Sequence, residues 1–462
     1  MDALRSYLTR AGPSAAPQIQ RDMGLSKSAF QRKMSPLLGD VLRVGRTRAT
    51  RYALRRAVDE VRTPTPVYEL DPEGGLRLAL TLHPVEPMGC WVEGHVAEVA
   101  SGFHETDPTE LGADPAVDLP WFLLDLKPAG FLGRQWLGAH GDAGFPGLLA
   151  RWSGDDVLRY AAQYGLWLPG AFVVGDWARG RLRDAPGPQV VPRDQAPTVF
   201  PALAAASRTT WGSSAGGEQP KFTVTLRYGE AVVPSLVKFS PPMDSPGGRR
   251  WADLLLAEHL AHEVLAEAGV AAARSELVDS GGARYLVVRR FDRHGAGGRS
   301  GLCSLAALDQ RGVGAELRSW SAVTGELVRQ GLLSQEDHQR VGWLEAFGHL
   351  IANTDMHPGN LSLSLRGTAI TGLAPVYDML PMFHAPRHGG ELVEGLYRPA
   401  AELGDVPARA LSAALTLWER LAADPRASAG FRALAARQGE VAEGVPTSPA
   451  GLAPSPGEVI RR

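Results

Sequence analysis

The residues best suited to chemistry lie close together in the last third of the chain. Asp355, His357 and Asn360 stand within six residues beside a Pro-Gly break, and an apolar run follows them. Phosphoryl transfer needs a carboxylate that receives the acceptor's proton and, close by, a neutral oxygen ligand for magnesium. Asp355 and Asn360, on a predicted non-helical loop, can supply both, and Asp378, 18 residues after Asn360, can supply a second metal ligand. The alternative is an Asx-rich turn whose side chains only cap backbone groups.

Three upstream stretches contain residues that such chemistry would need. Backbone N–H groups of the small residues before Lys221 can approach phosphate oxygens, and that lysine adds positive charge. Lys238 lies on a predicted buried strand, where a lysine needs a partner, and Glu258 lies on the helix predicted for residues 251–268. A strand lysine paired with a glutamate of the next helix is typical of protein kinases. The alternatives are a Gly-Gly hairpin turn before Lys221, an edge-strand lysine that reaches solvent at 238 and an exposed helix charge at 258. The strand predicted for residues 285–291 would offer backbone groups to adenine.

The N-terminal residues 1–60 predict a separate, basic module. Helices are predicted at 2–11, after a Ser14 cap, and at 27–38, and a hairpin follows at 41–54. This pattern is a winged helix-turn-helix, which we expect to contact DNA phosphates. The cationic residues of its third helix and wing are Lys27, Arg32, Lys33, Arg43, Arg46, Arg48 and Arg51. A basic module that binds another protein is the alternative.

Charge and composition restrict the class of protein. Residues 1–56 contain twelve Lys or Arg against three Asp, a net charge of +9, whereas the remainder carries −11, which suggests an anion-binding segment on an acidic body. Cys90 and Cys303 lack metal-type spacing, and the sequence has neither a signal-peptide core nor an apolar run of membrane length. We therefore expect a cytoplasmic protein with reduced thiols and no membrane partner. Residues 63–66 predict a linker, and a tail from Gly439 is expected to be disordered.

The motifs of the chain follow one another in the order AGGEQPK, LVKF, VVRRFDR, NTDMHPGN and VYDMLP, with Glu258 among them. In the order of these motifs the chain resembles the HipA family of bacterial serine/threonine kinases. Within that family the chain is similar to the YjjJ-like branch, which adds a DNA-binding-like domain at the N-terminus. The resemblance implies an α+β, bilobal, protein-kinase-like fold preceded by the winged helix-turn-helix. The implied domains are the winged helix (1–60), a HipA-type subdomain with the kinase N-lobe (65–300), a helical C-lobe (301–438) and the tail (439–462).

The resemblance also assigns roles to individual residues. Asp355 would accept the proton, Asn360 and Asp378 would hold Mg²⁺, and autophosphorylation of Ser213 or Ser214 would silence the enzyme. The implied positions around ATP are Ala215, Gly216, Gly217, Glu218, Gln219, Pro220, Lys221, Lys238, Glu258, Arg289, Arg290, Phe291, His357, Asn360, Tyr377 and Asp378.

The implied acceptor is a protein hydroxyl. Family members that arrest growth phosphorylate an aminoacyl-tRNA synthetase, and an antitoxin is an implied partner. Gly359 stands where the family usually has lysine, and HPGN resembles the loop of aminoglycoside and other small-molecule phosphotransferases. Arg289 stands where a glutamate is common, and the phosphate loop is one residue longer than usual. A small-molecule kinase is therefore an alternative, as is a DNA-binding regulator or nucleic-acid-acting toxin with a kinase scaffold.

Overall fold

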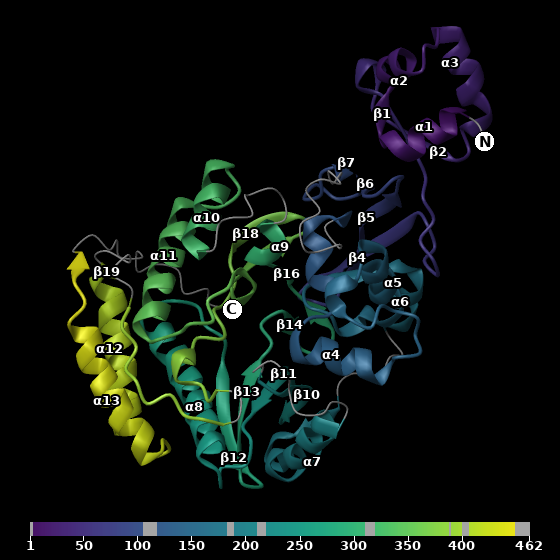
Figure 1. Ribbon diagram of the computed structural model, residues 1–462. Coiled ribbons are helices and arrows are strands. Elements are labelled where there is room, and N and C mark those ends of the chain that lie inside the picture. The colour runs from purple at the N-terminus through teal and green to yellow at the C-terminus, as the bar shows by residue number, and fades with distance from the viewer. Residues whose placement is uncertain are drawn as a thin grey trace. The chain divides into compact units, whose positions relative to one another are not determined.

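The computed structural model describes residues 3–104, 118–182, 189–209, 219–309, 319–387, 390–399 and 406–448. The chain forms two compact units. Unit 1 comprises Met1–Pro128, Gly141–Ala185 and the turn Arg366–Ala369, and unit 2 comprises Ala129–His140, Pro186–Leu365 and Ile370–Arg462. Both units combine helices with sheets (Figure 1), so the predicted α+β class is confirmed.

Unit 1 begins with three helices and a small sheet. The elements are α1 (Ala3–Ala11), β1 (Ser14–Ala15), α2 (Ala16–Asp22), α3 (Lys27–Met34), β2 (Val41–Val44) and β3 (Arg51–Leu54), with the strands in the order β1-β3-β2. Ser26 caps α3, because its Oγ accepts a hydrogen bond from Ala29 N at 3.2 Å. The predicted Ser14 cap is wrong, since Ser14 pairs with Tyr52 in the sheet and Ala15 precedes α2 without a side-chain cap.

A second sheet of five strands completes unit 1. The strands are β4 (Thr65–Leu70), β5 (Leu76–Pro84), β6 (Cys90–Gly94), β7 (Gly102–His104) and β8 (Phe172–Val174), in the order β7-β6-β5-β4-β8, and helices α5 (Gly154–Tyr164) and α6 (Gly175–Arg181) accompany them. The predicted linker at residues 63–66 is wrong, because Thr65 and Pro66 already belong to β4. Pro66 is tolerated there because β8 pairs with β4 only from Val67 onward.

The β2–β3 hairpin packs on the second sheet of unit 1. Three buried residues share one cluster across these elements: Leu42, Ala53 and Val85. Arg51, predicted to contact DNA, instead donates a hydrogen bond to Pro13 O at 2.6 Å and lies over the ring of Phe103, 4.9 Å from its centroid. One face of the hairpin is therefore occupied by protein, and we assign Arg51 a packing role.

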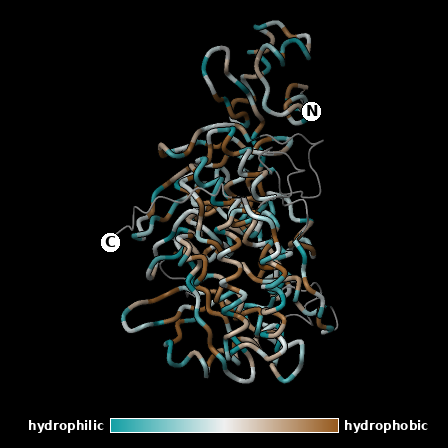
Figure 2. Tube along the Cα trace, turned by 90° about the vertical axis from the view of Figure 1, so that its left-hand side faces the viewer, coloured by the Kyte–Doolittle hydropathy of each residue, from teal (hydrophilic) through white to brown (hydrophobic). Residues whose placement is uncertain are grey.

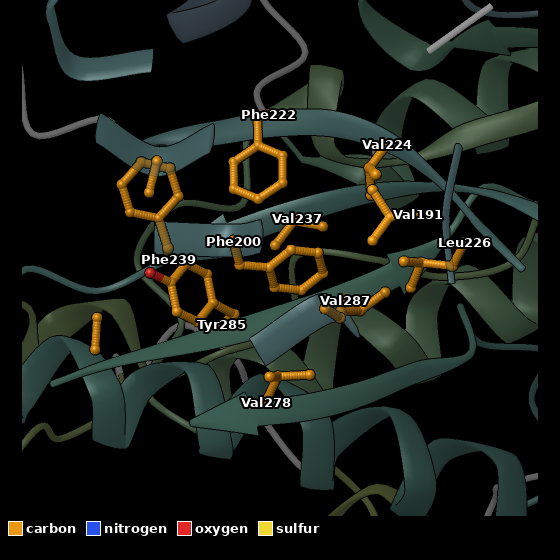
Figure 3. Packing of buried hydrophobic residues seen from close by; sticks show 13 residues of the cluster. Val191, Phe200, Phe222, Val224, Leu226, Val237, Phe239, Val278, Tyr285 and Val287 are labelled. Carbon is orange, nitrogen blue, oxygen red and sulfur yellow. The ribbon is translucent and has the colours of Figure 1, made fainter. Parts of the chain in front are cut away.

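Unit 2 is organised around another five-stranded sheet. Its strands are β9 (Val190–Pro192), β10 (Lys221–Tyr228), β11 (Ala231–Phe239), β12 (Ser275–Ser280) and β13 (Ala283–Arg289), in the order β12-β13-β11-β10-β9. Helix α7 (Ala196–Thr209) covers one face, where Phe200 packs against Phe222 and Tyr285 with ring centroids 5.5 and 5.4 Å away (Figure 3). This apolar face fixes the strands whose opposite face carries the polar residues of the site.

The opposite face of the sheet is covered by α8 (Pro246–Glu267), where Leu255 packs against Leu286 and Val288. Alternate residues of a strand face opposite sides of a sheet. Val237 belongs to the α7 cluster, so its neighbour Lys238 faces α8. The alternation of side chains along β11 therefore directs Lys238 to the face of the sheet that α8 covers.

The helix α8 begins five residues before the predicted Trp251. Ser245 caps it by accepting a hydrogen bond from Gly248 N at 3.0 Å, and Pro246 occupies the first turn, where its missing N–H costs nothing. Glycine is required at residue 248, since a Cβ there would lie 1.8 Å from Pro242 O.

Helices dominate the rest of unit 2. They are α4 (Gly130–Ala139), α9 (Leu305–Asp309), α10 (Trp320–Arg329), α11 (Gln335–Leu350), α12 (Ala408–Ala423) and α13 (Ala429–Glu443), and the strands β16 (Gly301–Ser304), β17 (Ser362–Arg366) and β18 (Ala369–Leu373) form a small sheet. Figure 1 shows α12 and α13 side by side. The predicted disordered tail begins too early, because Gly439 lies inside α13, whereas residues 449–462 lie outside the described part.

Hydrophobic and hydrophilic residues are interspersed along the described part of the trace (Figure 2). Among the described helices, none combines the length and the apolar character that crossing a bilayer requires. Cys90 and Cys303 are both buried, and neither takes part in a disulfide.

The buried His384 predicts a pH-dependent stability. Its side chain is 0% exposed. Burial, followed by the positive charge of Arg250, lowers the pKa of His384 from 6.5 to about 4. Between these values the unfolded chain binds the proton and the folded chain does not, so stability falls as the pH drops from 6.5 to 4, by roughly 3 kcal/mol at most.

Replacing the imidazole by an aliphatic group of similar size tests this expectation. Free energies of unfolding, measured by urea titration between pH 7 and pH 4, should fall less steeply for His384→Leu than for the wild type. Identical pH dependence in the two proteins would show that His384 does not titrate as described.

Candidate active site

Strand register places two lysines side by side. In the antiparallel pair β10–β11, Lys221 stands directly opposite Lys238. Opposed residues project from the same face of a sheet, so both ammonium groups face the side covered by α8. Lys238 is only 4% exposed, and a buried lysine requires compensating charge.

Two carboxylates supply that charge. Lys238 Nζ donates to both oxygens of Glu258, at 2.7 and 2.8 Å, and to Oδ1 of Asp378. The structure thus contains the predicted pair of Lys238 and Glu258, and it adds a contact with Asp378 that the sequence does not reveal. Burial would lower the pKa of Lys238, but Asp378 and Glu258 outweigh it and raise the pKa. Lys238 therefore remains an ammonium ion.

The two carboxylates respond differently to the same surroundings. Burial would raise the pKa of Asp378, but Lys238 and then Lys221 lower it to about 2. Asp378 is thus ionised at neutral pH. Glu258 is 0% exposed, and burial raises its pKa although Lys238 opposes the shift. The ionised form of Glu258 therefore depends on its contacts.

Asp355 lies on the loop that follows α11, and Asn360 lies on a single 3₁₀ turn, Pro358–Asn360, where a non-helical loop was predicted. Asn360 Nδ2 donates to Asp355 O at 2.7 Å. Desolvation raises the pKa of Asp355, His357 opposes it, and the charges of Asp378 and Lys221 also act on it. The carboxylate of Asp355 is therefore within electrostatic reach of Lys221 and Asp378.

Asn353 joins the loop to the Asp378 segment, and sequence reasoning missed it. Its Oδ1 accepts a hydrogen bond from Asp355 N at 3.0 Å, and its Nδ2 donates to Asp378 O at 3.3 Å. Asn353 is 2% exposed, so its side chain is fixed by the fold. Ala352 and Asp378 have φ of 61° and 54°, a region that costs energy for residues other than glycine. An asparagine two residues before the aspartate was the available signal.

Removing the Asn353 amide should slow the predicted phosphotransfer and destabilise the fold. In Asn353→Ala, Asp355 N–H loses its acceptor, and the loop loses its connection to Asp378. We expect kcat for phosphotransfer to fall by about tenfold or more and the free energy of unfolding by about 1–3 kcal/mol. Steady-state kinetics and urea titration measure both. The exposed neighbour provides the control Thr354→Ala, and a well-folded Asn353→Ala with normal kcat would contradict the assigned role.

Two aromatic side chains donate hydrogen bonds to backbone carbonyls of the loop, one on each side of Pro358. Trp320 Nε1 donates to His357 O at 3.0 Å. Tyr377 Oη donates to Gly359 O at 3.1 Å and lies 2.8 Å from Ser362 Oγ. The loop backbone is therefore fixed on both sides of Pro358.

The predicted adenine segment is brought together only in part. Phe291 stacks on Tyr377 with ring centroids 6.0 Å apart, so these two predicted residues meet. Arg289 instead lies over the ring of Tyr228, and Arg290 pairs with Asp292 at 2.7 Å. The backbone N–H groups of Arg289 and Arg290 are already bonded to carbonyls of other residues. Adenine could therefore use only the remaining backbone groups of this segment.

Asn360 and Asp378 fit a magnesium ion by their chemistry. Mg²⁺ prefers oxygen ligands and is usually held by one or two carboxylates together with substrate phosphates. Asp378 is ionised, and the Nδ2 of Asn360 is occupied by Asp355 O, which leaves its amide oxygen as the ligand atom. Within the described residues, no group of three or more His, Cys, Asp or Glu could hold a metal ion. A site completed by nucleotide phosphates is consistent with that donor set.

Part of the predicted phosphate loop lies outside the described residues, namely Ser213, Ser214, Ala215, Gly216, Gly217 and Glu218, and so does the side chain of Arg48. Gln219 and Pro220 are half-buried and lead directly into β10. Of the DNA-binding candidates, Lys27, Arg32, Lys33, Arg43 and Arg46 are exposed.

Comparison with known proteins identifies the family to which the chain belongs. The model of the HipA-like C-terminal domain matches residues 213–445, and the chain belongs to the HipA-like family. The model of the YjjJ-like toxin middle domain matches residues 61–183. Within the family, the chain is a homologue of toxin YjjJ of Escherichia coli (strain K12), with 35% identity over 434 residues that cover 92% of this chain and 94% of the relative.

Two solved structures show weaker similarity. HipA of Shewanella oneidensis MR-1, in complex with HipB and its operator DNA, aligns with a TM-score of 0.49 and 15% identity over 81% of this chain and 95% of that chain. The proinflammatory kinase CtkA of Helicobacter pylori aligns with a TM-score of 0.35 and 13% identity over 50% of this chain and 90% of that chain.

Proposed function

We propose that the protein is an ATP- and Mg²⁺-dependent kinase that transfers the γ-phosphate to a serine or threonine hydroxyl of a protein. The observation that carries this proposal is the contact of one buried ammonium, Lys238, with both Glu258 and Asp378. Lysine on a strand, glutamate on the next helix and a metal-binding aspartate are the parts that position ATP in protein kinases. Membership of the HipA-like family supports the same reaction.

Each residue then has a role in the transfer. Lys221 and Lys238 neutralise phosphate charge, and Asn360 and Asp378 hold Mg²⁺, which supplies further positive charge to the phosphates when it is bound. Asp355 receives the hydroxyl proton, and its raised pKa brings it closer to the pH at which a base works best. A phosphoproteomic comparison of cells that express wild type or Asp355→Asn tests the proposal. Phosphosites present only with the wild type are the expected result, and their absence would contradict a protein acceptor.

A small-molecule acceptor is favoured by one observation at the loop. A Cβ at Gly359 would lie 2.9 Å from two atoms of the His357 ring, whose Nδ1 accepts a hydrogen bond from Gly359 N at 3.1 Å. A lysine at this position, as the family usually has it, would therefore require the His357 ring to move. Incubation with labelled ATP and either lysate proteins or a panel of metabolites and aminoglycosides separates the two acceptors.

Phosphorylation of Ser213 or Ser214 would regulate the kinase. A phosphate group adds nearly two negative charges and should displace the loop from its ATP-binding form. Mass spectrometry that finds both serines unmodified after incubation of the active enzyme with ATP would count against this regulation.

We propose that the first part of unit 1 is a winged helix-turn-helix that binds DNA. Three helices, a three-stranded sheet and exposed cations on α3 and the hairpin support this proposal. A triple variant in which Lys27, Arg32 and Arg46 are each replaced by glutamate should lose salt-dependent binding to duplex DNA. The control variant Arg10→Glu, on α1, should keep it. Equal DNA affinity of the triple variant and the control would show that these cations do not contact DNA.

The remaining parts of the proposal concern the cell. By analogy with the family, we propose a growth-arresting toxin that acts in the cytoplasm, with an antitoxin partner and an aminoacyl-tRNA synthetase among its candidate acceptors. The domain boundaries at 1–60, 65–300 and 301–438 also stay proposals, supported by family matches at 61–183 and 213–445. If the protein arrested growth through DNA binding alone, the variant Asp378→Ala would arrest growth as the wild type does.

A further inference from the structure

A buried histidine lies behind the ion pair of the site. His262 follows Glu258 by one turn of α8 and is 3% exposed. Its Nε2 lies 3.9 Å from Glu258 Oε1, and within the described residues this nitrogen has no hydrogen-bond partner. The polar group facing that nitrogen is thus the carboxylate that binds Lys238.

The other ring nitrogen connects His262 to the surface. His262 Nδ1 lies 3.1 Å from Ser275 Oγ on β12, and the same Oγ lies 3.0 Å from His259 Nδ1. His259 Nε2 in turn lies 3.5 Å from Oε1 of Glu263, which is 48% exposed. A row of polar side chains therefore leads from the exposed Glu263 to the buried Glu258.

The single proton of the serine hydroxyl limits how this row can be protonated. A hydroxyl donates one hydrogen bond and accepts up to two, so at most one of the two Nδ1 atoms can accept from Ser275; if His262 is that one, His259 must donate. If His262 accepts at Nδ1, its neutral ring carries the proton on Nε2 and presents N–H to Glu258. If His262 donates at Nδ1, its Nε2 lone pair faces the carboxylate.

Charge selects the first arrangement. Glu258 binds the ammonium of Lys238 through both oxygens, which favours its ionised form, and a lone pair directed at an ionised carboxylate would be repelled. His262 itself stays uncharged, because burial and then Lys238 lower its pKa to about 3. Ser275 then donates to His262, and His259 donates to Ser275.

We propose that His262 is a positioning residue that presents its Nε2–H to Glu258 and so keeps this carboxylate ionised and directed at Lys238. Ser275 and His259 fix the tautomer. The expected effect of His262 on ATP binding rests on the proposed kinase function. The expected tautomer of His262 does not depend on that function. Lys238 contacts two carboxylates, so when phosphates draw it away from Asp378, its remaining anchor is Glu258.

Nitrogen-15 spectra of the full-length protein labelled at histidine test the tautomer directly. The His262 signals, assigned by their loss in His262→Gln, should show a neutral ring protonated at Nε2 and unchanged between pH 8 and pH 6. In Ser275→Ala the tautomer should become mixed. A neutral ring protonated at Nδ1, or a charged ring, would overturn the proposal whether or not the protein is a kinase.

Three substitutions test what the tautomer does for ATP. In His262→Gln the side-chain amide N–H can take the position of the Nε2–H of histidine. The shorter side chain of His262→Asn can reach Ser275 but not Glu258. The side chain of His262→Leu fills the space without a polar group. We expect direct ATP binding and the KM for ATP to weaken by about tenfold in the Asn and Leu variants, with Gln close to wild type and the KM for acceptor unchanged. Equal ATP affinity in the Leu and Gln variants would overturn the proposal. A wild-type protein without transferase activity would instead refute the proposed function and leave the tautomer test intact.

Discussion

Replacing Asp355 with asparagine is expected to lower phosphotransfer by about 10²- to 10⁴-fold while ATP affinity stays close to that of the wild type. The substitution preserves size and polarity but removes the group that receives the acceptor's proton. ATP binding should persist, because Asp355 is exposed on its loop and Lys238 is held by Glu258 and Asp378 rather than by Asp355. Single-turnover transfer of labelled phosphate and direct nucleotide titration measure the two quantities separately.

The neighbouring residue supplies a matched control for that experiment. Thr354 is exposed on the same loop, so Thr354→Ala should change neither quantity. If Asp355→Asn transferred phosphate at the wild-type rate, another group would have to be the base. If it lost nucleotide binding together with turnover, the residue would serve the nucleotide rather than the acceptor.

Removing the ammonium of Lys238 should destabilise unit 2 severely. In Lys238→Met the carboxylate of Glu258, which is 0% exposed, loses its partner, and breaking a buried pair in this way costs about 3–5 kcal/mol. Glu258→Gln should cost less, because Lys238 keeps its contact with Asp378. Urea unfolding and amide hydrogen exchange of β11 and α8 provide the measurement.

A double substitution separates the buried charge from other effects. Lys238→Met combined with Glu258→Leu removes both charges, and it should recover most of the stability that Lys238→Met loses. Nucleotide binding should stay weak in the double variant, because the phosphates still lack their lysine. Additive losses in the double variant would mean that the two residues do not compensate each other.

Much of the site could be predicted because its parts are local patterns. A lysine between apolar residues of a strand needs a partner, and the protein-kinase arrangement places a glutamate on the next helix, so Lys238 and Glu258 could be paired from the sequence. The contact of Asp378 with Lys238 joins residues 140 positions apart. It depends on a backbone with φ of 54° at Asp378, which no periodicity reports.

The errors have equally physical causes. Proline at residues 64 and 66 suggested a linker, but Pro66 needs only one strand edge without a partner, and β4 provides it. Ser14 has the right residue type for a helix cap, yet its backbone is used in the sheet with β3. Asn353 and His262 act through the direction of their side chains in a folded interior, which residue types cannot specify.

The helix α8 supports two separate sets of contacts. One side carries Glu258 toward the lysines, and Asp253 accepts hydrogen bonds from Ser428 N and Oγ at 2.8 and 2.6 Å, at the start of α13. Asp253 and Glu258 lie on this same continuous helix. We therefore expect that a proteolytic cut or an insertion between α12 and α13, which would disturb the contacts of Ser428 with Asp253, also weakens the proposed nucleotide binding, although the change lies far along the sequence from the residues of the site.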